Sequence, residues 1–262
     1  MINFPSILKF PQLLGRKTIG FHQFIGKNFI NFLNFLVILL SKPFYFKRLW
    51  EELINIGITS TPIVAMTAIF SGSVLALQSY VGFSQYNASE SIPLIVVLSI
   101  TRELGPVLTG LMLSGRIASN IASEIGAMRI TDQLDAIKII GIEKIQYLLR
   151  PKLIAMIIFM PILTLISDVL GMLGGYIVSI YKLGFNDALY IKATFDYLKM
   201  SDIYYGIIKS FYFGMIIVCI GYVSGLSAQQ NSHGTGIATR NAVVYSTICI
   251  LITNYILTYI LF

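Results

Sequence analysis

The feature that most constrains the fold is a set of five apolar stretches, each long enough to cross a bilayer as a helix. A membrane-spanning helix needs about 20 consecutive, mostly apolar residues, because the hydrocarbon core is about 30 Å thick. A backbone inside lipid must satisfy its own hydrogen bonds, which a helix does within one segment. Gly57, Pro62 and Gly72 are expected to bend or break the first stretch. The predicted fold is all-α and polytopic, with spans at Leu53–Ser89, Ser91–Ser114, Leu153–Tyr181, Ile203–Ala228 and Asn241–Phe262.

The composition agrees with an integral membrane protein. Charged residues make up 12% of the 262 residues, against about 25% in soluble domains, and the mean hydropathy is +0.78. The formal net charge of +7 does not indicate nucleic-acid binding, because the basic residues lie beside apolar segments. Lysine and arginine in such places set membrane topology and contact lipid headgroups.

The first 50 residues differ in character from the rest, so an N-terminal region, 1–50, and a membrane domain, 51–262, are predicted. Between residues 18 and 41, polar side chains recur at helical spacing and large apolar side chains fill the other face. The uninterrupted apolar run Phe35–Leu40 is too short to span. We predict a cytoplasmic-side helix lying in the membrane interface, with a poor first span as the alternative. The polar stripe consists of Gln23, Lys27, Asn31 and Asn34.

The distribution of lysine and arginine predicts the orientation. The first 50 residues hold seven of the 19, the segment Arg116–Lys152 holds six, and the loop at 80–91 holds none. Cytoplasmic loops are enriched in lysine and arginine. The N-terminus and Arg116–Lys152 are therefore expected in the cytoplasm, and five spans place the C-terminus on the other side. The loop Lys182–Lys209 holds four basic residues, diluted by aspartates.

Two adjacent charges, Arg102 and Glu103, lie inside the second predicted span. A helix rises about 1.5 Å per residue, so counting from Ser91 places Arg102 roughly 17 Å deep, near the middle of the core. A charge there costs about 2.5–3.5 kcal/mol on insertion scales. Neighbouring residues on a helix do not face each other, so both charges need other partners. They are interpreted either as part of a substrate path or as a structural ion-pair network.

The second span leads into a small, polar segment. Small residues recur there at every fourth position, a spacing that allows helices to approach closely. They are Gly115, Ser119, Ser123 and Ala127, and the pairs Gly171/Gly175 and Gly221/Gly225 repeat the pattern. From Glu124 to Ile142, apolar and charged residues alternate at helical spacing, which predicts a short amphipathic cytoplasmic helix. Its predicted ion pairs are Arg129–Asp132 and Asp135–Lys138.

The sequence offers little for catalysis or for holding a metal or a nucleotide. The segment Gly110–Arg116 has the glycine spacing of a phosphate-binding loop, but Arg116 and Ile117 stand where a lysine and a hydroxyl residue are needed. The two cysteines and the two histidines lie far apart, which gives no metal site. We predict no catalytic residue, no metal and no cofactor bound by this chain.

Three segments together resemble the permeases of the MlaE family: AIFSGSVLALQSY (68–80), RELGPVLTGLMLSGRIASNIASEIGAMRITDQLDAI (102–137) and GTGIATRNAVV (234–244). The similarity runs from about residue 50 to the C-terminus, so 51–262 is identified as an MlaE-like permease domain. Such permeases are membrane subunits of ABC transporters that move phospholipids between the two membranes of Gram-negative envelopes, with relatives at the plastid inner envelope. The resemblance implies a homodimer, two copies of a separate ATPase that binds the ATP, and an accessory substrate-binding protein with an MCE domain.

The resemblance also implies which residues act. The EIGAMR-type helix is similar to the coupling helices with which ABC permeases dock into a groove on the ATPase. It is expected within 119–148, with candidate residues Glu124, Gly126, Met128, Arg129, Asp132, Gln133 and Leu134. The lipid is expected between the two protomers, along a path whose candidate lining residues are Leu75, Leu77, Tyr80, Arg102 and Glu103.

The predicted function is a permease subunit that moves phospholipid or a related lipid between envelope membranes, with no enzymatic activity of its own. Its expected place is the cell inner membrane, or the plastid inner envelope for a plastid-encoded chain. The main alternative is a self-contained secondary transporter or channel, although no internal repeat is evident and five spans do not divide into halves. A membrane-embedded lipid enzyme is a second alternative, for which Asp168 alone does not supply a catalytic set.

Overall fold

The computed structural model describes residues 45–86 and 91–261. The predicted interfacial helix at 18–41 lies outside these residues and stays a prediction. Every regular element in the described ranges is helical, with η1 a 3₁₀ turn and η3, η4 and η5 π-helical turns. In chain order the elements are α2 (Phe46–Ile56), η1 (Ile58–Ser60), α3 (Thr61–Ser84), α4 (Ile92–Ser99), η3 (Ile100–Leu104), α5 (Gly105–Leu113), η4 (Ser114–Ala118), α6 (Ser119–Ile130), α7 (Gln133–Ile139), η5 (Ile145–Leu149), α8 (Arg150–Tyr181), α9 (Asp187–Tyr197), α10 (Met200–Leu226) and α11 (Ser232–Leu261).

Five helical segments of the described chain are long and apolar enough to cross a bilayer, which confirms the predicted all-α, five-span fold. Their boundaries differ from the predicted ones, most clearly in span two. Span two runs from Ile92 to Ile130 through α4, η3, α5, η4 and α6. Its 39 residues correspond to about 58 Å, nearly twice the thickness of a bilayer core. The five segments are Phe46–Ser84, Ile92–Ile130, Ile145–Tyr181, Met200–Leu226 and Ser232–Leu261.

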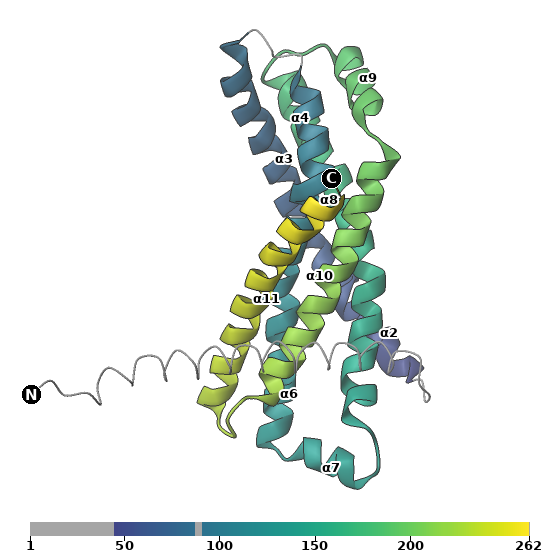
Figure 1. Cartoon of the computed structure of the whole chain (residues 1–262), viewed down its shortest axis with the longest axis vertical. Coiled ribbons are helices and arrows are strands. Elements are labelled where there is room, and N and C mark those ends of the chain that lie inside the picture. The colour runs from purple at the N-terminus through teal and green to yellow at the C-terminus, as the bar shows by residue number, and fades with distance from the viewer. Residues whose placement is uncertain (1–44, 87–90, 262) are drawn as a thin grey trace, which may run out of the picture. The chain divides into compact units, whose positions relative to one another are not determined.

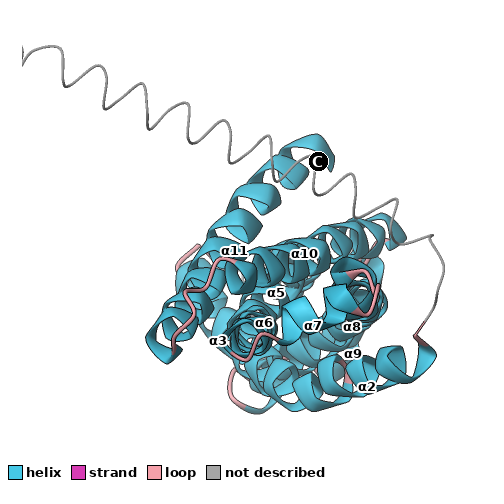
Figure 2. Ribbon diagram, turned by 90° about the horizontal axis from the view of Figure 1, so that it is seen from below, coloured by secondary structure: helices cyan, strands magenta, loops and turns pink. Residues whose placement is uncertain are grey.

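Within the unit formed by residues 45–262, the spans run roughly side by side, with α9 at one end and α7 at the other (Figure 1). We refer to these as the α9 end and the α7 end. In a view along the bundle, α5 and α6 lie centrally, whereas α2, α3 and α11 lie toward the outside (Figure 2). In the most apolar 18-residue stretch of α11 only 11% of the residues are buried, against 56% in that of α10. This agrees with the outer position of α11.

The first span is divided at Gly57, as the sequence predicts. α2 ends at Ile56, η1 follows, and α3 begins at Thr61 with Pro62 in its first turn, where a proline needs no hydrogen-bonded N–H. α2 crosses the predicted domain boundary at residue 50. Its outward side carries the α2 stripe, which consists of Phe46, Trp50 and Ile54. A tryptophan in an exposed apolar stripe is typical of the membrane interface.

Glycines bring two pairs of helices into close contact. Where α3 crosses α8, a Cβ added to Gly72 would collide with the backbone of Gly171. In α10, a Cβ added to Gly221 would lie 3.0 Å from the Ala118 carbonyl oxygen in η4. Close helix approach through small residues is thus confirmed at these two crossings. Gly115 differs, because an added Cβ would meet nothing within 4 Å there.

Aromatic side chains close the α9 end. Phe185, in the connection between α8 and α9, contacts Tyr80 of α3 and Tyr190 of α9 edge to face, with ring centroids 6.2 and 6.4 Å away. Tyr190 is buried, and burial raises the pKa of its phenol. The Asn186 side chain caps α9 by accepting a hydrogen bond from the Leu189 N–H at 3.2 Å. These contacts hold α9 against the ends of the spans.

The α7 end differs from the prediction of one helix from Glu124 to Ile142. α6 continues span two to Ile130, and the chain then turns at Asp132, whose φ of +54° is left-handed. A left-handed residue interrupts an α-helix, and aspartate tolerates this conformation better than most residues. A separate helix, α7, then begins at Gln133. Helical periodicity does not reveal this break, because the break depends on the backbone conformation of one residue.

Candidate functional site

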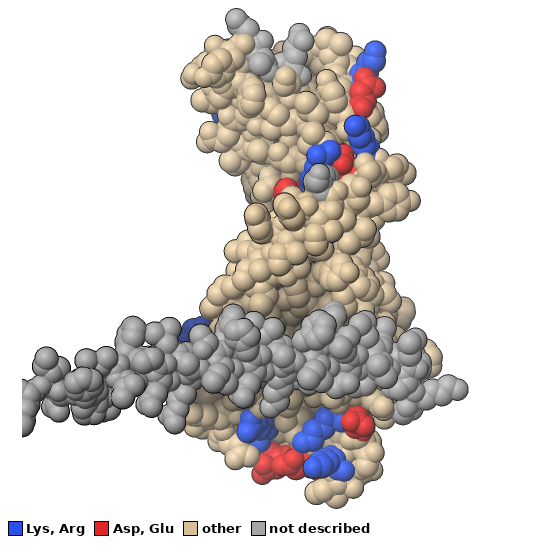
Figure 3. Space-filling view, viewed as in Figure 1, with Lys and Arg blue, Asp and Glu red and all other residues tan. Residues whose placement is uncertain are grey.

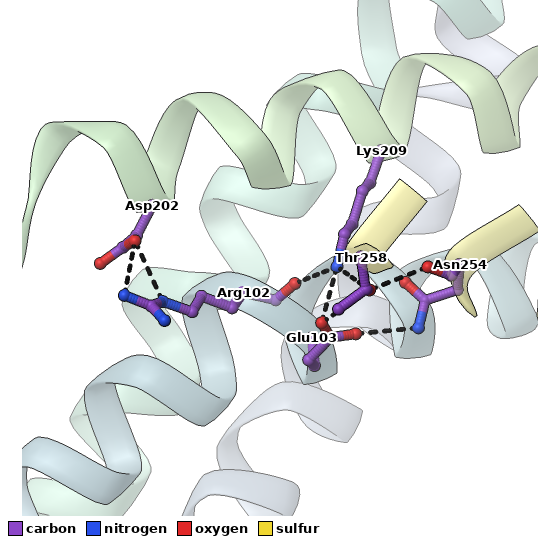
Figure 4. A network of polar contacts seen from close by, with 6 residues as sticks. All are labelled: Arg102, Glu103, Asp202, Lys209, Asn254 and Thr258. Atoms are coloured by element: carbon purple, nitrogen blue, oxygen red, sulfur yellow. Dashed lines mark hydrogen bonds and ion pairs between the residues drawn. The ribbon is translucent and has the colours of Figure 1, made fainter. Parts of the chain in front are cut away.

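The ion pairs that join different spans of the described chain lie in two places. Toward the α9 end, span two, α10 and α11 contribute to the six-residue network (Figure 4), and toward the α7 end, α2, α6 and α8 meet at the Lys152 cluster. The six-residue network consists of Arg102, Glu103, Asp202, Lys209, Asn254 and Thr258. The Lys152 cluster consists of Glu52, Glu124 and Lys152.

Lys209 is the centre of the six-residue network. Its side chain is fully buried, and its ammonium group donates to the Glu103 carboxylate at 2.7 Å, to the Thr258 hydroxyl at 2.8 Å and to the Arg102 carbonyl at 2.8 Å. An ammonium group has three donors, so each has an acceptor. The Asn254 amide donates to the other Glu103 oxygen at 2.8 Å. The buried charge is therefore both paired and hydrogen-bonded, as a charge inside a bilayer must be.

Arg102 forms the second ion pair of the network. Its Nε and one terminal nitrogen both contact Oδ1 of Asp202, each at 3.0 Å. The Asp202 side chain is 2% exposed and the Arg102 side chain 33% exposed, so this pair reaches from the interior to the edge of the bundle. With two acids and two bases, the six-residue network has no formal net charge.

The local sequence explains why the Arg102 carbonyl is open to a side-chain donor. It lies in η3, and the residue four positions later is Pro106, which has no N–H to donate. Lys209 supplies a donor instead. Beside the proline, the space that a side chain at Gly105 would need is filled by the carboxyl group of Asp168 in α8. π-helical turns of this kind are frequent at functional sites.

The structure gives the positions of these charges along the helices. Asp202 lies in the first turn of α10 and Thr258 in the last turn of α11. The network therefore lies toward the α9 end of these helices. Its depth in a bilayer, which counting from Ser91 places near the middle of the core, stays a prediction. Lys209, which counts among the basic residues of the loop Lys182–Lys209 but also falls in the predicted span Ile203–Ala228, is a buried residue of α10.

The sequence alone does not reveal the partners of Arg102 and Glu103. Asp202 and Lys209 are 100 and 106 positions away from them, and periodicity within one helix does not show which helices meet. Lys209 gave the one available signal, because a lysine in the apolar run 203–228 requires a buried anion. The two charges thus have the partners that their placement required, and their role in a lipid path stays a prediction.

The Lys152 cluster joins three helices near the α7 end. Lys152 lies in the first turn of α8, with its side chain 4% exposed. Its ammonium group pairs with Glu124 of α6 at 2.7 Å and with Glu52 of α2. Two carboxylates share one ammonium group, so the cluster has a formal charge of −1.

Several predicted coupling residues have partners inside the chain. Glu124 belongs to the Lys152 cluster. A Cβ added to Gly126 would lie 2.9 Å from the Thr235 side chain, so α6 and α11 are closely packed at this point. The Arg129 guanidinium donates to the Leu226 carbonyl at the end of α10. These three residues hold α6 within the bundle.

The other predicted coupling residues lie at or near the surface of the α7 end. Leu134 is buried and Met128 half-buried, whereas Asp132 and Gln133 are exposed. The exposed pair lies at the break between α6 and α7. The coupling role itself stays a prediction for all seven residues.

The two ion pairs predicted in this region are wrong for the described chain. Arg129 turns to a backbone carbonyl of α10 rather than to Asp132. Asp135 pairs at 3.1 Å with Lys144, from the segment after α7, rather than with Lys138. The break at Asp132 removes the helical spacing on which the first pair depends, and the returning chain offers Asp135 a different partner.

The three candidate lipid-path residues of α3 lie in different surroundings. Leu75 and Tyr80 pack against a buried cluster between α3 and the start of span two, whereas Leu77 is half-buried. The buried cluster consists of Ala76, Ile92, Val96 and Ile100. A lipid-lining role stays a prediction for all three.

Charge and apolar surface are separated along the bundle. On the face in Figure 3, most charged side chains gather toward the α7 end and near α9, and the visible surface between them is uncharged apart from a basic patch at the left edge, just above the grey trace. α3 and α11 carry many large, exposed apolar residues, such as Phe70 and Ile256. An apolar band between charged ends is the surface that a bilayer covers. Together with the paired charges inside the bundle, it defines a multi-pass α-helical membrane protein.

Comparison with known proteins assigns the chain to one family of membrane proteins. The sequence profile of the family described as Permease MlaE matches residues 49–260. The chain therefore belongs to the MlaE permease family, which confirms the resemblance carried by the three sequence segments.

Relatives from three bacteria agree with this assignment. A probable ABC transporter permease protein of Rickettsia bellii is 48% identical over 98% of this chain and 99% of its own length. A probable ABC transporter permease protein of Synechocystis is 37% identical over 81% of each chain. The intermembrane phospholipid transport system permease protein MlaE of Haemophilus influenzae is 31% identical over 98% of each chain.

Proposed function

We propose that this chain is the membrane subunit of an ABC transporter that moves phospholipid, or a related lipid, between the membranes of a cell envelope. Membership of the MlaE permease family supports a permease that does not itself hydrolyse ATP, and one relative is named for intermembrane phospholipid transport. The observation that carries the proposal is span two, a helical run from the six-residue network to the surface beside α7. It links polar groups in the bundle to a surface suited to docking an ATPase.

The α7 end supplies that docking surface. Asp132 and Gln133 are exposed at the helix break, and Ile139 and Ile140 are 86% and 73% exposed. Exposed large apolar side chains rimmed by polar ones have the composition of a protein interface. In this proposal α7 makes the contact with the ATPase, and Glu124 and Arg129 anchor α6, to which α7 is attached.

Two largely exposed apolar faces are proposed to form the homodimer and the lipid path. In the most apolar 18-residue stretch of each span, only 28% of the residues of the first span and 11% of those of α11 are buried. A second copy against these faces would bury them by two-fold symmetry and enclose a space for acyl chains. Leu75, Leu77 and Tyr80 of α3, with Arg102 and Glu103 of span two, are the candidate lining residues.

The proposed topology places the α7 end in the cytoplasm and the α9 end on the opposite side of the inner membrane. The basic residues between Arg116 and Lys152 support this orientation. α9 then faces the side on which an MCE-domain protein would bind, and it presents Leu189 and Phe195, which are 68% and 71% exposed. This helix is the proposed contact for that partner.

Purification with a co-expressed ATPase tests the proposal. The double variant Gln133→Arg/Ile140→Asp changes only exposed side chains, so the yield of the permease should match that of the wild type. ATPase co-purification and lipid transfer between vesicles should both fall by about tenfold or more, because a charge introduced into an apolar contact costs over ~1.4 kcal/mol. Phe195→Asp, at the α9 end, is the matched control and should keep the ATPase bound.

Two results would refute parts of this proposal. Full ATPase retention by the α7 double variant would refute α7 as the docking surface. Lipid or solute movement that needs an ion gradient and no ATPase would refute the ABC permease itself in favour of a secondary transporter.

A further inference from the structure

A polar cavity opens beside the Lys152 cluster, between α2, η1, span two and α8. Its volume is ≈ 230 Å³. Its polar lining consists of Glu52, Asn55, Thr59, Arg116, Asn120 and Lys152. Lys152 is buried, whereas Asn55, Thr59 and Asn120 are exposed, so the cavity has a closed end at the lysine and an open mouth. The cavity is smaller than the pockets that hold drug-sized ligands, so it has room for a small group only.

Arg116 lines this cavity from η4. Its guanidinium donates to the Thr59 carbonyl, and no carboxylate of the described residues forms an ion pair with it. A guanidinium has five N–H donors in a planar fork that matches two oxygens of a phosphate group. Arginine is therefore the preferred residue for binding phosphate, and most of its donors are available to a ligand here.

The charges around the cavity form a dipole. Arg116 is positive, and the Lys152 cluster is negative overall when Glu124 is counted, which pairs with Lys152 behind the cavity lining. Glu124 follows Arg116 by eight positions on the same helical run, about 12 Å further along its axis. A plain anion would be attracted by the arginine and repelled by the carboxylates. A zwitterion with a phosphate and an ammonium group would match both poles.

The cavity lies where lipid headgroups lie. The helix that forms one wall, α2, carries Glu52 and Asn55 on the cavity side and the α2 stripe on the outside. An amphipathic helix with an outward tryptophan is typical of the membrane interface. From the bundle centre toward α7, Arg116 comes first and the carboxylates second. In the leaflet nearest the α7 end, a lipid presents its phosphate and then its terminal headgroup in the same order.

We propose that this cavity binds a phosphoethanolamine group, with Arg116 on the phosphate and Glu52, the glutamate of the Lys152 cluster that lines the cavity, on the primary ammonium group. The source is a phospholipid of the adjoining leaflet or free phosphoethanolamine. The site lies away from the six-residue network, and its occupancy does not require the lipid to be cargo. A ligand here joins α2, span two and α8 at one point.

Native mass spectrometry of the full chain with its co-expressed ATPase, mixed with defined lipids in mild detergent, tests the proposal. The measured quantity is the difference in retained lipid between variant and wild type, because lipid elsewhere on the complex contributes equally to both. We expect phosphatidylethanolamine to be retained over phosphatidylcholine, whose quaternary ammonium group donates no hydrogen bond. We also expect it to be retained over phosphatidylglycerol, which has no ammonium group.

Three variants separate the two poles of the site. Arg116→Gln removes the charge-assisted contact to phosphate and should weaken retention about tenfold. Glu52→Gln should leave phosphate binding in place but reduce the preference for phosphatidylethanolamine over phosphatidylglycerol. Asn120→Phe narrows the mouth without changing a charge and should lower retention even if Arg116→Gln reduces the yield. The matched control is Lys192→Gln, which removes an exposed cation from α9 and should retain lipid as the wild type does.

A competition arm distinguishes the two sources. Displacement of the lipid by soluble O-phosphoethanolamine would assign the site to the headgroup alone, whereas selective lipid retention without displacement would assign it to the lipid. Unchanged retention in both Arg116→Gln and Asn120→Phe would overturn the proposal, and so would a preference for phosphatidylglycerol. A complex that retains the lipid but transfers none would refute the proposed function and leave this site standing.

Discussion

The six-residue network and the Lys152 cluster place two buried lysines in opposite settings. In the network, Lys209 meets three acceptors and the formal charges cancel. In the cluster, Lys152 is buried, but its partners Glu52 and Glu124 are 18% and 34% exposed and the charges do not cancel. The charges of the first group cancel within the chain, although Asp202 Oδ2 and Asn254 Oδ1 are buried without a hydrogen-bond partner among the described residues, whereas the second group has charge left over beside an open cavity.

This difference indicates that the six-residue network acts as a structural anchor, a group that holds helices together, whereas the Lys152 cluster has the features of a binding site. A buried charge whose donors all have acceptors gains nothing from a ligand, and removal of one partner leaves the other uncompensated. A group with surplus charge beside a cavity can gain a partner without losing one. The comparison therefore predicts that changes in the network act mainly on stability and that changes around the cavity act mainly on binding.

The largest effect is expected from Lys209→Met. The substitution leaves Glu103 without its cation, at a cost of about 3 kcal/mol, the low end of the range for a broken buried pair because the Glu103 side chain is 36% exposed. Yield and melting temperature should fall sharply. The double variant Lys209→Met/Glu103→Gln should recover much of the loss, since both charges are gone. A single variant as stable as the wild type would show that the network is not an anchor.

Substitution of two glycines of span two tests whether the helices pack more tightly near the six-residue network than near the cavity. Gly105→Ala forces a methyl group against the Asp168 carboxyl group and the Ile100 carbonyl, which should cost about 1–3 kcal/mol. Gly115→Ala, near the cavity, meets nothing within 4 Å and should be neutral or stabilising by up to about 1 kcal/mol, because alanine favours the helix. Chemical denaturation of both variants in detergent measures the contrast, and equal losses would contradict it.

Lys152→Met is expected to cost less than Lys209→Met, about 1–2 kcal/mol, because Glu52 borders a cavity that opens to the surface and the Glu124 side chain is 34% exposed. The remaining like charges repel each other, so added salt should reduce the loss. Melting temperatures at low and high salt measure both effects. A loss as large as that of Lys209→Met, and independent of salt, would remove the distinction between the two sites.

The smallest effect is expected from Asp135→Asn at the α7 end. The pair with Lys144 is exposed, with Asp135 70% exposed, and such pairs contribute less than about 0.5 kcal/mol. The melting temperature should match that of the wild type. A clear destabilisation would mean that the segment after α7 depends on this contact.

The five spans could be predicted from the sequence because length and apolarity suffice to define them. The division of the first span was also predictable, since Gly57 and Pro62 act on the backbone locally. The end of span two was not, because Ser119–Ile130 is polar enough to resemble a connector yet continues the helix. Its polar groups are satisfied by neighbouring helices, which composition does not report.

The site was predicted only in part, for a related reason. Arg102 and Glu103 stand out as charges in an apolar segment, but their partners come from α10 and α11 and depend on how the helices pack. Glu124 and Arg129 match a family motif, yet the contacts that hold them lie on α8 and α10. The cavity at Arg116 depends on four separate elements and has no linear pattern that could reveal it.

Span two contains two π-helical turns at which its helical twist differs from that of the rest. η3 and η4 are π-helical turns on either side of α5, and each holds one more residue per turn than an α-helix does. Conversion of either turn to α geometry rotates the helix beyond it by about 100° relative to the rest. In the proposed function, a rotation of α6 would be taken up at these two turns before it reaches the other end of span two. Arg116 lies in η4, and Arg102 and Glu103 lie in η3.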